Sequence, residues 1–213
     1  MGKIGTTLFI AALAFVNVAC SGSSSQMIPI HLEEKHVGKP IKDVLIIAII
    51  DNQEIRAVFE KHFKDWLNAK GVEAITSVNV LAVEMGADLE KEAIVEVVDK
   101  YENDAILITH LVGFPESEVF SRDRPQYFYN YFGFYNYGLA YVTWPTVYGE
   151  KVKFSLETGL YDVNTESLIW AGETQLKNPE TTGKAIGQVA ELVMKELEKN
   201  GLLPKTPKDK KSK

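Results

Sequence analysis

The chain has 213 residues, which is enough for one ordinary domain with appendages but hardly for two full cores. Its hydrophobic share of 46% and charged share of 24% are typical of a globular protein and exclude wholesale disorder and fibrous repeats. Residues 1–19 hold one Lys and residues 204–213 hold five Lys and one Asp, so residues 20–203 hold 17 basic and 28 acidic residues, a net charge of −11. An acidic body repels phosphate backbones, and we therefore expect no nucleic-acid partner.

The N-terminal segment has the features of a secretory signal. Residues 8–16 are an apolar run of nine residues, preceded by Lys3. This run is too short for a hydrocarbon core that needs roughly 20 helical residues, but it matches the apolar centre of a signal peptide. Cys20, the only cysteine of the chain, comes shortly after it. A lone exposed thiol in an exported protein would oxidise or cross-link. The pattern predicts a signal peptide over residues 1–19 and a covalent lipid on Cys20, with ordinary cleaved secretion and an uncleaved anchor as alternatives.

The residues around Cys20 resemble the signals of bacterial lipoproteins. In that family a short small-and-apolar motif, here Val18-Ala19, precedes a modified cysteine, although Asn17 stands where an apolar residue is usual. Ser21, rather than Asp, resembles the residue after the cysteine in outer-membrane-destined members. The resemblance implies a protein held by lipid in the outer membrane and facing the periplasm. It implies no cofactor other than this covalent lipid.

Two flanking segments are expected outside the folded part. Residues 20–40 contain Ser, Gly, Pro and mixed charges without a sustained period, and they predict a flexible tether between lipid and fold. Residues 204–213 lack the apolar side chains that ordering requires, and they predict a disordered Lys-rich tail. The alternative for the tail is attraction to anionic headgroups or peptidoglycan carboxylates. One periplasmic domain is expected over residues 41–203.

Within residues 41–203 the apolar pattern predicts the order β-α-β-α-β, then a β-hairpin and a last helix. The first strand is an apolar run with many β-branched residues, which is typical of a strand buried on both faces. Right-handed crossovers would make the first three strands parallel, with the hairpin adding antiparallel strands. The expected fold class is therefore mixed α/β, with about five strands in one mixed sheet and helices packed on it. The expected strands are 44–50, 72–81, 105–112, 151–161 and 168–176, and the expected helices lie at about 52–71, 89–101 and 180–200.

Three helices have an expected buried face, because their apolar residues recur at three and four positions. In the first helix these residues are Ile55, Val58, Phe59, Phe63, Trp66 and Leu67. In the middle helix these residues are Leu89, Ala93, Val97 and Tyr101. In the last helix they are Ile186, Val189, Ala190, Val193 and Leu197.

The composition changes sharply in an aromatic insertion at residues 114–148, which holds 13 of the 22 aromatic residues of the chain. Glycines and asparagines interrupt it, so we expect no helix. Six tyrosines share one parity and would lie on one face of an extended chain. We take them as a candidate binding surface, because tyrosine buries a large area at small entropic cost and keeps a hydroxyl. The alternatives are a loop packed over the edge of the core and strands that build a pore or assembly. The six are Tyr127, Tyr129, Tyr131, Tyr135, Tyr137 and Tyr141.

Motifs that carry catalysis are missing from the sequence. It has no Gly-rich phosphate loop, dinucleotide fingerprint, serine elbow, zinc helix or paired cysteines, so we expect neither an enzyme nor a metal site. The alternative is a cell-wall hydrolase that uses His110 near the carboxyl end of a strand, with Glu116 or Glu118 to orient it. We favour a buried or edge-satisfied histidine, because a catalytic constellation requires more than one group.

The hairpin gives a second resemblance. Residues 160–172 resemble the hairpin of bacterial envelope lipoproteins, in which a strand ends in Asp162, turns through Thr165, and resumes with an apolar pair and Trp170. The closing helix and the Tyr-rich insertion are similar to those of a lipoprotein family of unknown function. More distantly, the order of elements is similar to lipoprotein activators of penicillin-binding proteins and to curli-secretion lipoproteins.

This second resemblance implies a non-catalytic binding or scaffolding role in the cell envelope. The membrane, and an envelope protein or peptidoglycan, would be the partners. The resemblance supplies no catalytic residues. It implies structural roles for the three hairpin residues, with Trp170 sealing the sheet against a helix.

Overall fold

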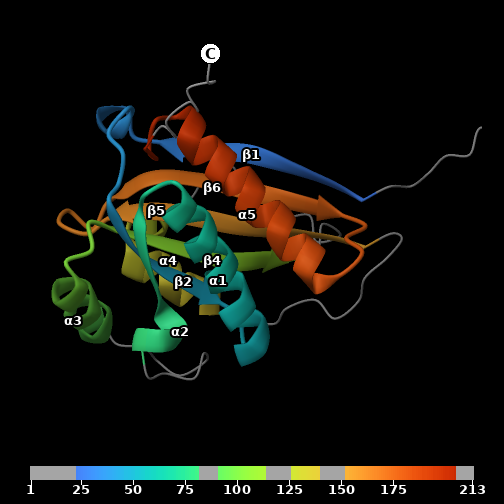
Figure 1. Cartoon of the computed structure of the whole chain (residues 1–213), viewed down its shortest axis with the longest axis horizontal. Helices are drawn as coiled ribbons and strands as arrows, with labels where there is room; N and C mark the ends of the chain where they lie inside the picture. The colour runs from blue at the N-terminus through green and yellow to red at the C-terminus, as the bar shows by residue number, and fades with distance from the viewer. Residues whose placement is uncertain (1–22, 82–90, 114–125, 140–151, 205–213) are drawn as a thin grey trace, which may run out of the picture.

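A mixed β-sheet with helices on both faces organises the protein (Figure 1). The computed structural model describes residues 23–81, 91–113, 126–139 and 152–204. The strands are β1 (Ser24–Leu32), β2 (Asp43–Ile49), β3 (Glu73–Thr76), β4 (Ala105–Gly113), β5 (Lys153–Asp162) and β6 (Leu168–Lys177). The α-helices are α1 (Gln53–Ala69), α2 (Ser77–Val80), α3 (Lys91–Tyr101), α4 (Tyr131–Gly138) and α5 (Thr182–Lys199), and the 3-10 helices are η1 (Glu34–His36) and η2 (Gln126–Tyr129).

The strands of this sheet follow the order β1-β6-β5-β4-β2-β3. β2 lies parallel to β3 and β4, whereas β5 is antiparallel to both β4 and β6. The predicted mixed α/β class is confirmed, as are the parallel arrangement of the first three predicted strands and the hairpin that follows them. In the turn between β5 and β6, the Asp162 carboxylate accepts hydrogen bonds from the Thr165 backbone N–H at 2.7 Å and its hydroxyl at 2.8 Å.

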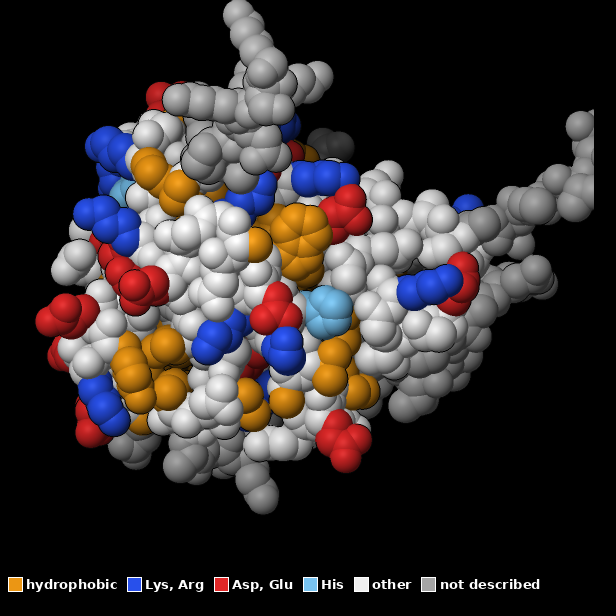
Figure 2. Space-filling view, viewed as in Figure 1, with side chains coloured by type: hydrophobic (Ala, Val, Ile, Leu, Met, Phe, Trp, Pro, Cys, Tyr) orange, Lys and Arg blue, Asp and Glu red, His pale blue; other side chains and the backbone are white. Residues whose placement is uncertain are grey.

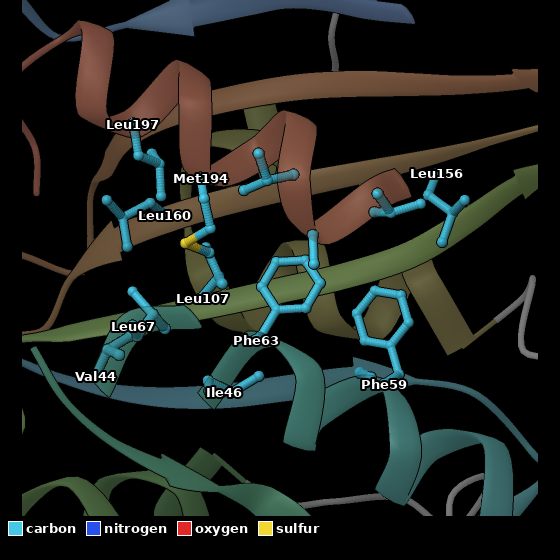
Figure 3. Packing of buried hydrophobic residues seen from close by; sticks show 14 of the residues in the cluster. Val44, Ile46, Phe59, Phe63, Leu67, Leu107, Leu156, Leu160, Met194 and Leu197 are labelled. Atoms are coloured by element: carbon cyan, nitrogen blue, oxygen red, sulfur yellow. The ribbon is translucent and has the colours of Figure 1, made fainter. Parts of the chain in front are cut away.

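The face covered by α1 and α5 encloses the larger core (Figure 3). Phe59 and Phe63 of α1 stack with ring centroids 4.8 Å apart. Trp170 is 1% exposed and belongs to the same cluster, as the resemblance of the hairpin to that of envelope lipoproteins implied. The predicted buried face of α5 is confirmed, because Ile186, Val189, Ala190, Val193 and Leu197 are all buried.

Two predicted details of this region are wrong. Val58 and Trp66 of α1 are 44% and 37% exposed, because the stripe that faces the sheet is centred on Phe59, Phe63 and Leu67. The predicted second strand stops at Thr76, and a single helical turn, α2, replaces its second half.

The opposite face is covered by α3, η2 and α4. Val97 of α3 is buried as predicted, whereas Tyr101, at the end of α3, is 39% exposed, contrary to the prediction. Leu45, Ile47 and Ile49 of β2 point to this side, where they join Ile106 and Ile108 of β4 in a second core. β2 is therefore apolar on both faces, as its sequence predicts. Among the helices of the described residues, none combines the length and apolar character needed to cross a membrane.

The prediction that residues 20–40 are a flexible tether is wrong for Ser24–Leu32, which form β1 and pair antiparallel with β6. Burial alternates along its first half, as expected for a strand with one face on the core. Pro29 cannot donate a ladder hydrogen bond, which an edge strand tolerates. The register shifts between Pro29 and His31. The sequence did not predict this strand, because its serines and its proline interrupt the apolar pattern. With β1 the sheet has six strands, one more than the five expected.

A buried ion pair joins α1 to the sheet. Glu60, 0% exposed, accepts hydrogen bonds from the Ala48 N–H at 3.0 Å, the Arg56 Nε at 3.2 Å, the Ser77 hydroxyl at 2.5 Å and the Val78 N–H at 3.0 Å. One carboxylate therefore satisfies donors from α1, β2 and α2. Buried charges are tolerated only when they are paired in this way.

Replacing Glu60 by Ala should lower the free energy of unfolding by about 3–5 kcal/mol, because the buried donors lose their shared acceptor. The control is Lys61→Ala, one residue further along α1. Lys61 and its partner Asp65 are 72% and 60% exposed, so its loss should cost less than about 1 kcal/mol. Urea denaturation of both variants measures the difference. Equal effects would show that the Glu60 network contributes no more than a surface pair.

Candidate functional site

Within the aromatic insertion, Tyr131–Gly138 form a short helix on the sheet, contrary to the expectation of extended chain. Asn130 caps α4, because its side-chain oxygen accepts hydrogen bonds from the backbone N–H groups of Phe132 and Gly133, each at 3.1 Å. The buried residues of α4 follow a helical spacing of three, four and seven positions: Tyr131, Phe134, Tyr135 and Gly138. This spacing was present in the sequence, and packing of the aromatic stripe on the second core outweighs the poor helix propensity of the glycines.

Polar contacts hold the start of α4 to α3 and to the hairpin. The Asn130 amide donates to the Glu166 carboxylate at 3.1 Å, and Lys91 of α3 contacts the same carboxylate at 2.5 Å. These hydrogen bonds, that of Lys91 first, lower the pKa of Glu166. Lys91 also lies 5.9 Å from the centroid of the Tyr131 ring. Burial raises the pKa of the Tyr131 hydroxyl, which therefore remains neutral.

The six candidate tyrosines do not share one face. Tyr131 is 2% and Tyr135 0% exposed, whereas Tyr129 is 45% exposed. Tyr137 is half-buried, with its ring edge-on to His110 at 5.4 Å. Tyr127 lies in η2, and Tyr141 lies outside the described residues, so the prediction of a binding surface is untested for these two.

Tyr129 is the tyrosine that the fold leaves most available among those whose side chains are described. Its ring meets His31 of β1 edge-on, with centroids 5.6 Å apart. It also meets Phe128 edge-on at 5.7 Å, and Phe128 is buried in the second core. The Phe128 carbonyl accepts a hydrogen bond from the Tyr161 hydroxyl at 2.9 Å, which fixes η2 to β5. An exposed aromatic ring on a fixed backbone beside an edge strand is suited to contact a partner.

His110 of β4 lies under α4 and is 0% exposed. Its ring packs against Phe134 with centroids 4.6 Å apart, and a side chain in place of Gly138 would come within 3.0 Å of its Cβ. The imidazole Nδ1 donates to the Leu111 carbonyl at 2.8 Å. The prediction of a buried histidine is confirmed. Glu116 and Glu118, the partners expected for an enzyme, lie outside the described residues.

Two glutamates that the sequence analysis missed lie in register with His110. Glu157 of β5 is the cross-strand partner of His110, and their Oε2 and Nε2 atoms are 3.6 Å apart. Glu173 of β6 is in turn the partner of Glu157. Both glutamates are buried, at 1% and 5% exposure, and Gln175 donates to Glu173 at 2.9 Å. Both glutamates lie inside the strands predicted for the hairpin, which was a detectable signal of a polar row within the sheet.

This row could exchange a proton between an imidazole and a carboxylate. His110 lies beneath α4, however, and a substrate would reach it only if the helix moved away. Among the described residues, no three His, Cys, Asp or Glu side chains are grouped so that they could hold a metal ion.

A pocket of about 290 Å³ lies at the other end of β2, where β2 and β3 begin. Asp43 and Glu73, which are partners across these strands, line it together with Lys64, Asn68 and Tyr101. Burial, followed by the nearby Glu73 carboxylate, raises the pKa of Asp43. The pocket has two carboxylates and one lysine in a lining that is otherwise part polar and part apolar, and it is separate from the aromatic segment.

No family model matches the sequence, and no curated protein matches it. The fold resembles those of bacterial lipoproteins at low identity. One such structure is the PelC dodecamer from Paraburkholderia phytofirmans, at 11% identity and a TM-score of 0.44, covering 87% of this chain and 100% of PelC. Another is lipoprotein GNA1162 from Neisseria meningitidis, at 11% identity and a TM-score of 0.38, covering 73% of this chain and 96% of that protein. At these identities the likeness concerns the fold alone.

Substitutions at the most buried and the most exposed of the described candidate tyrosines, Tyr135 and Tyr129, test the described packing of the aromatic segment. Tyr135→Ser should lower the free energy of unfolding by about 3–5 kcal/mol, because it empties a large buried site. Tyr129→Ser should change it by less than about 1 kcal/mol, as is usual for surface positions. Thermal or urea denaturation followed by circular dichroism measures both. A large loss at Tyr129 together with none at Tyr135 would contradict the described packing of α4.

Proposed function

We propose that the protein is a lipid-anchored, non-catalytic binding or scaffolding component of a bacterial cell envelope, held in the outer membrane and facing the periplasm. The observation that carries this proposal is Cys20. It is the only cysteine of the chain, and it comes directly after the apolar run and the small residues of a lipoprotein-type signal.

The surface of the fold is compatible with this role. Figure 2 shows basic and acidic side chains interspersed over the face of α1 and α5, without the basic patch that nucleic-acid binding requires. The buried position of His110 beneath Phe134 and Tyr137 favours a structural role over catalysis. For a partner, an envelope protein or peptidoglycan, we propose the surface formed by Tyr129 and His31, because it is the exposed part of the described aromatic cover.

Acylation is tested on the native protein. We expect mass spectrometry of material purified from membranes to find a chain that begins at Cys20 and carries acyl groups, and density-gradient fractionation to place it with the outer membrane. Cys20→Ala should abolish both the lipid and the membrane association. Covalent acyl chains contribute about 0.8 kcal/mol per buried methylene, which explains why their loss releases the domain. An intact Met1 terminus with an unmodified thiol would overturn the proposal.

Partner binding is tested by cross-linking in intact cells. A photo-reactive residue at Tyr129 should trap an envelope protein or glycan strand, because this ring is 45% exposed. The matched control is the same residue at Val58, which is 44% exposed on the other face of the sheet. Products that form equally from both positions would reflect general crowding and would contradict a specific surface at Tyr129.

A further inference from the structure

The N-terminal end of the described fold is attached to α5. The Gln188 side-chain amide donates a hydrogen bond to the Ser23 hydroxyl at 3.2 Å, and Ser24 already pairs with Lys177 of β6. Only residues 21 and 22 separate Cys20 from Ser23. Because consecutive Cα atoms are about 3.8 Å apart, the Cα of Cys20 lies within about 11 Å of the Cα of Ser23.

This reach is short on the scale of a bilayer. The polar layer on each side of the hydrocarbon core is roughly 5–8 Å thick. If Cys20 is acylated, as the proposed function holds, its lipid is inserted and Ser23 must lie in or just outside the headgroup layer. The end of the sheet beside Ser23 is then held against the membrane, whereas a tether over residues 20–40 would have left the domain free to rotate.

A pair of lysines lies at this end of the sheet. Lys153, the first residue of β5, is directly opposite Lys177, the last residue of β6, and Ser24 lies beside Lys177 on its other side. Both lysines are exposed. Within the described residues, neither belongs to an ion pair. Like charges directly opposite on neighbouring strands repel each other.

Some of the other exposed lysines are neutralised locally. On or next to α1 and α5, four of them pair with an acidic residue about one helical turn away: Lys61, Lys184, Lys195 and Lys199. Lys153 and Lys177 therefore form a local positive site at the anchored end of a domain whose net charge is strongly negative. An anionic surface over this pair would attract both lysines and offset their mutual repulsion.

We propose that the end of the sheet formed by Ser24, Lys153 and Lys177 rests on the anionic headgroups of the membrane that holds Cys20. The last turn of α5 then points away from the bilayer. In Figure 1 the start of β1 and the first turn of α5 lie toward the right, and the last turn of α5 lies toward the upper left. A helix of 18 residues separates these ends by about 27 Å.

Fluorescence quenching in vesicles tests this orientation. The acylated full-length chain is reconstituted with anionic lipid and a headgroup-attached quencher, and a single new cysteine carries the fluorophore, because the acylated Cys20 no longer reacts. Gly183→Cys places the probe in the first turn of α5, where an added Cβ meets no atom within 4 Å. Val37→Cys places it at the other end, where the Gly38 N–H donates to the Asn200 carbonyl at 3.1 Å. We expect quenching at Gly183→Cys to exceed that at Val37→Cys several-fold.

The lysines are tested with a charge-matched control. Each lysine near an anionic surface favours contact by a factor of roughly five. Lys153→Gln/Lys177→Gln should therefore weaken the preference of the Gly183→Cys probe for anionic over uncharged vesicles by a factor of roughly 25. Lys195→Gln/Lys199→Gln removes the same charge from the far half of α5 and should leave that preference unchanged.

Three failures of this test can be told apart. Equal quenching at both probe positions in an acylated, vesicle-bound protein would overturn the orientation and leave the proposed function standing. Equal effects of the two lysine pairs would overturn the role of Lys153 and Lys177. A chain without acyl mass on Cys20 that does not bind vesicles would overturn the proposed function, and the orientation with it.

Discussion

The two apolar faces of the central strands are the constraint on which the rest of the structure depends. Alternate residues of β2 enter separate cores, with Ile46 in one and Ile47 in the other. Both faces must therefore be covered. The long helices α1 and α5 cover one face, but α3 alone is too short for the other. The aromatic segment completes that second cover, which explains why its richest stretch, at η2 and α4, packs inward instead of forming a tyrosine face in solvent.

The parts of the fold with a regular period were predictable from the sequence, and the parts that depend on tertiary pairing were not. The buried face of α5 was evident because five apolar residues recur at three and four positions. β1 was missed because an edge strand with serines and Pro29 has no apolar run, and its partner β6 follows far later in the chain. α4 was missed because glycine was given more weight than the spacing of Tyr131, Phe134 and Tyr135, although buried contacts override propensity.

The candidate site shows the same division. His110 could be assigned as buried from its place in an apolar strand, but its neighbours could not be assigned from sequence proximity. The structure aligns it with Glu157, 47 positions further along, because β4 and β5 are antiparallel partners. The Glu60 network also joins residues that are distant in sequence, since Glu60 contacts Ala48 and Val78. Cross-strand register, which no local motif encodes, decides which polar groups lie beside His110.

The position of β1 also changes what a lipid on Cys20 would do. With a tether as long as residues 20–40, the lipid would fix only the location of the domain, and each face would meet the periplasm equally. Because the strand begins at Ser24 and Ser23 contacts α5, an acylated Cys20 would fix the orientation as well. The ring of Tyr129 meets His31 edge-on, near the far end of β1 from Ser24, and would be held away from the headgroups. A single edge strand would therefore connect the anchor at one end to an accessible aromatic contact at the other, which is the geometry that a membrane-held binding protein needs.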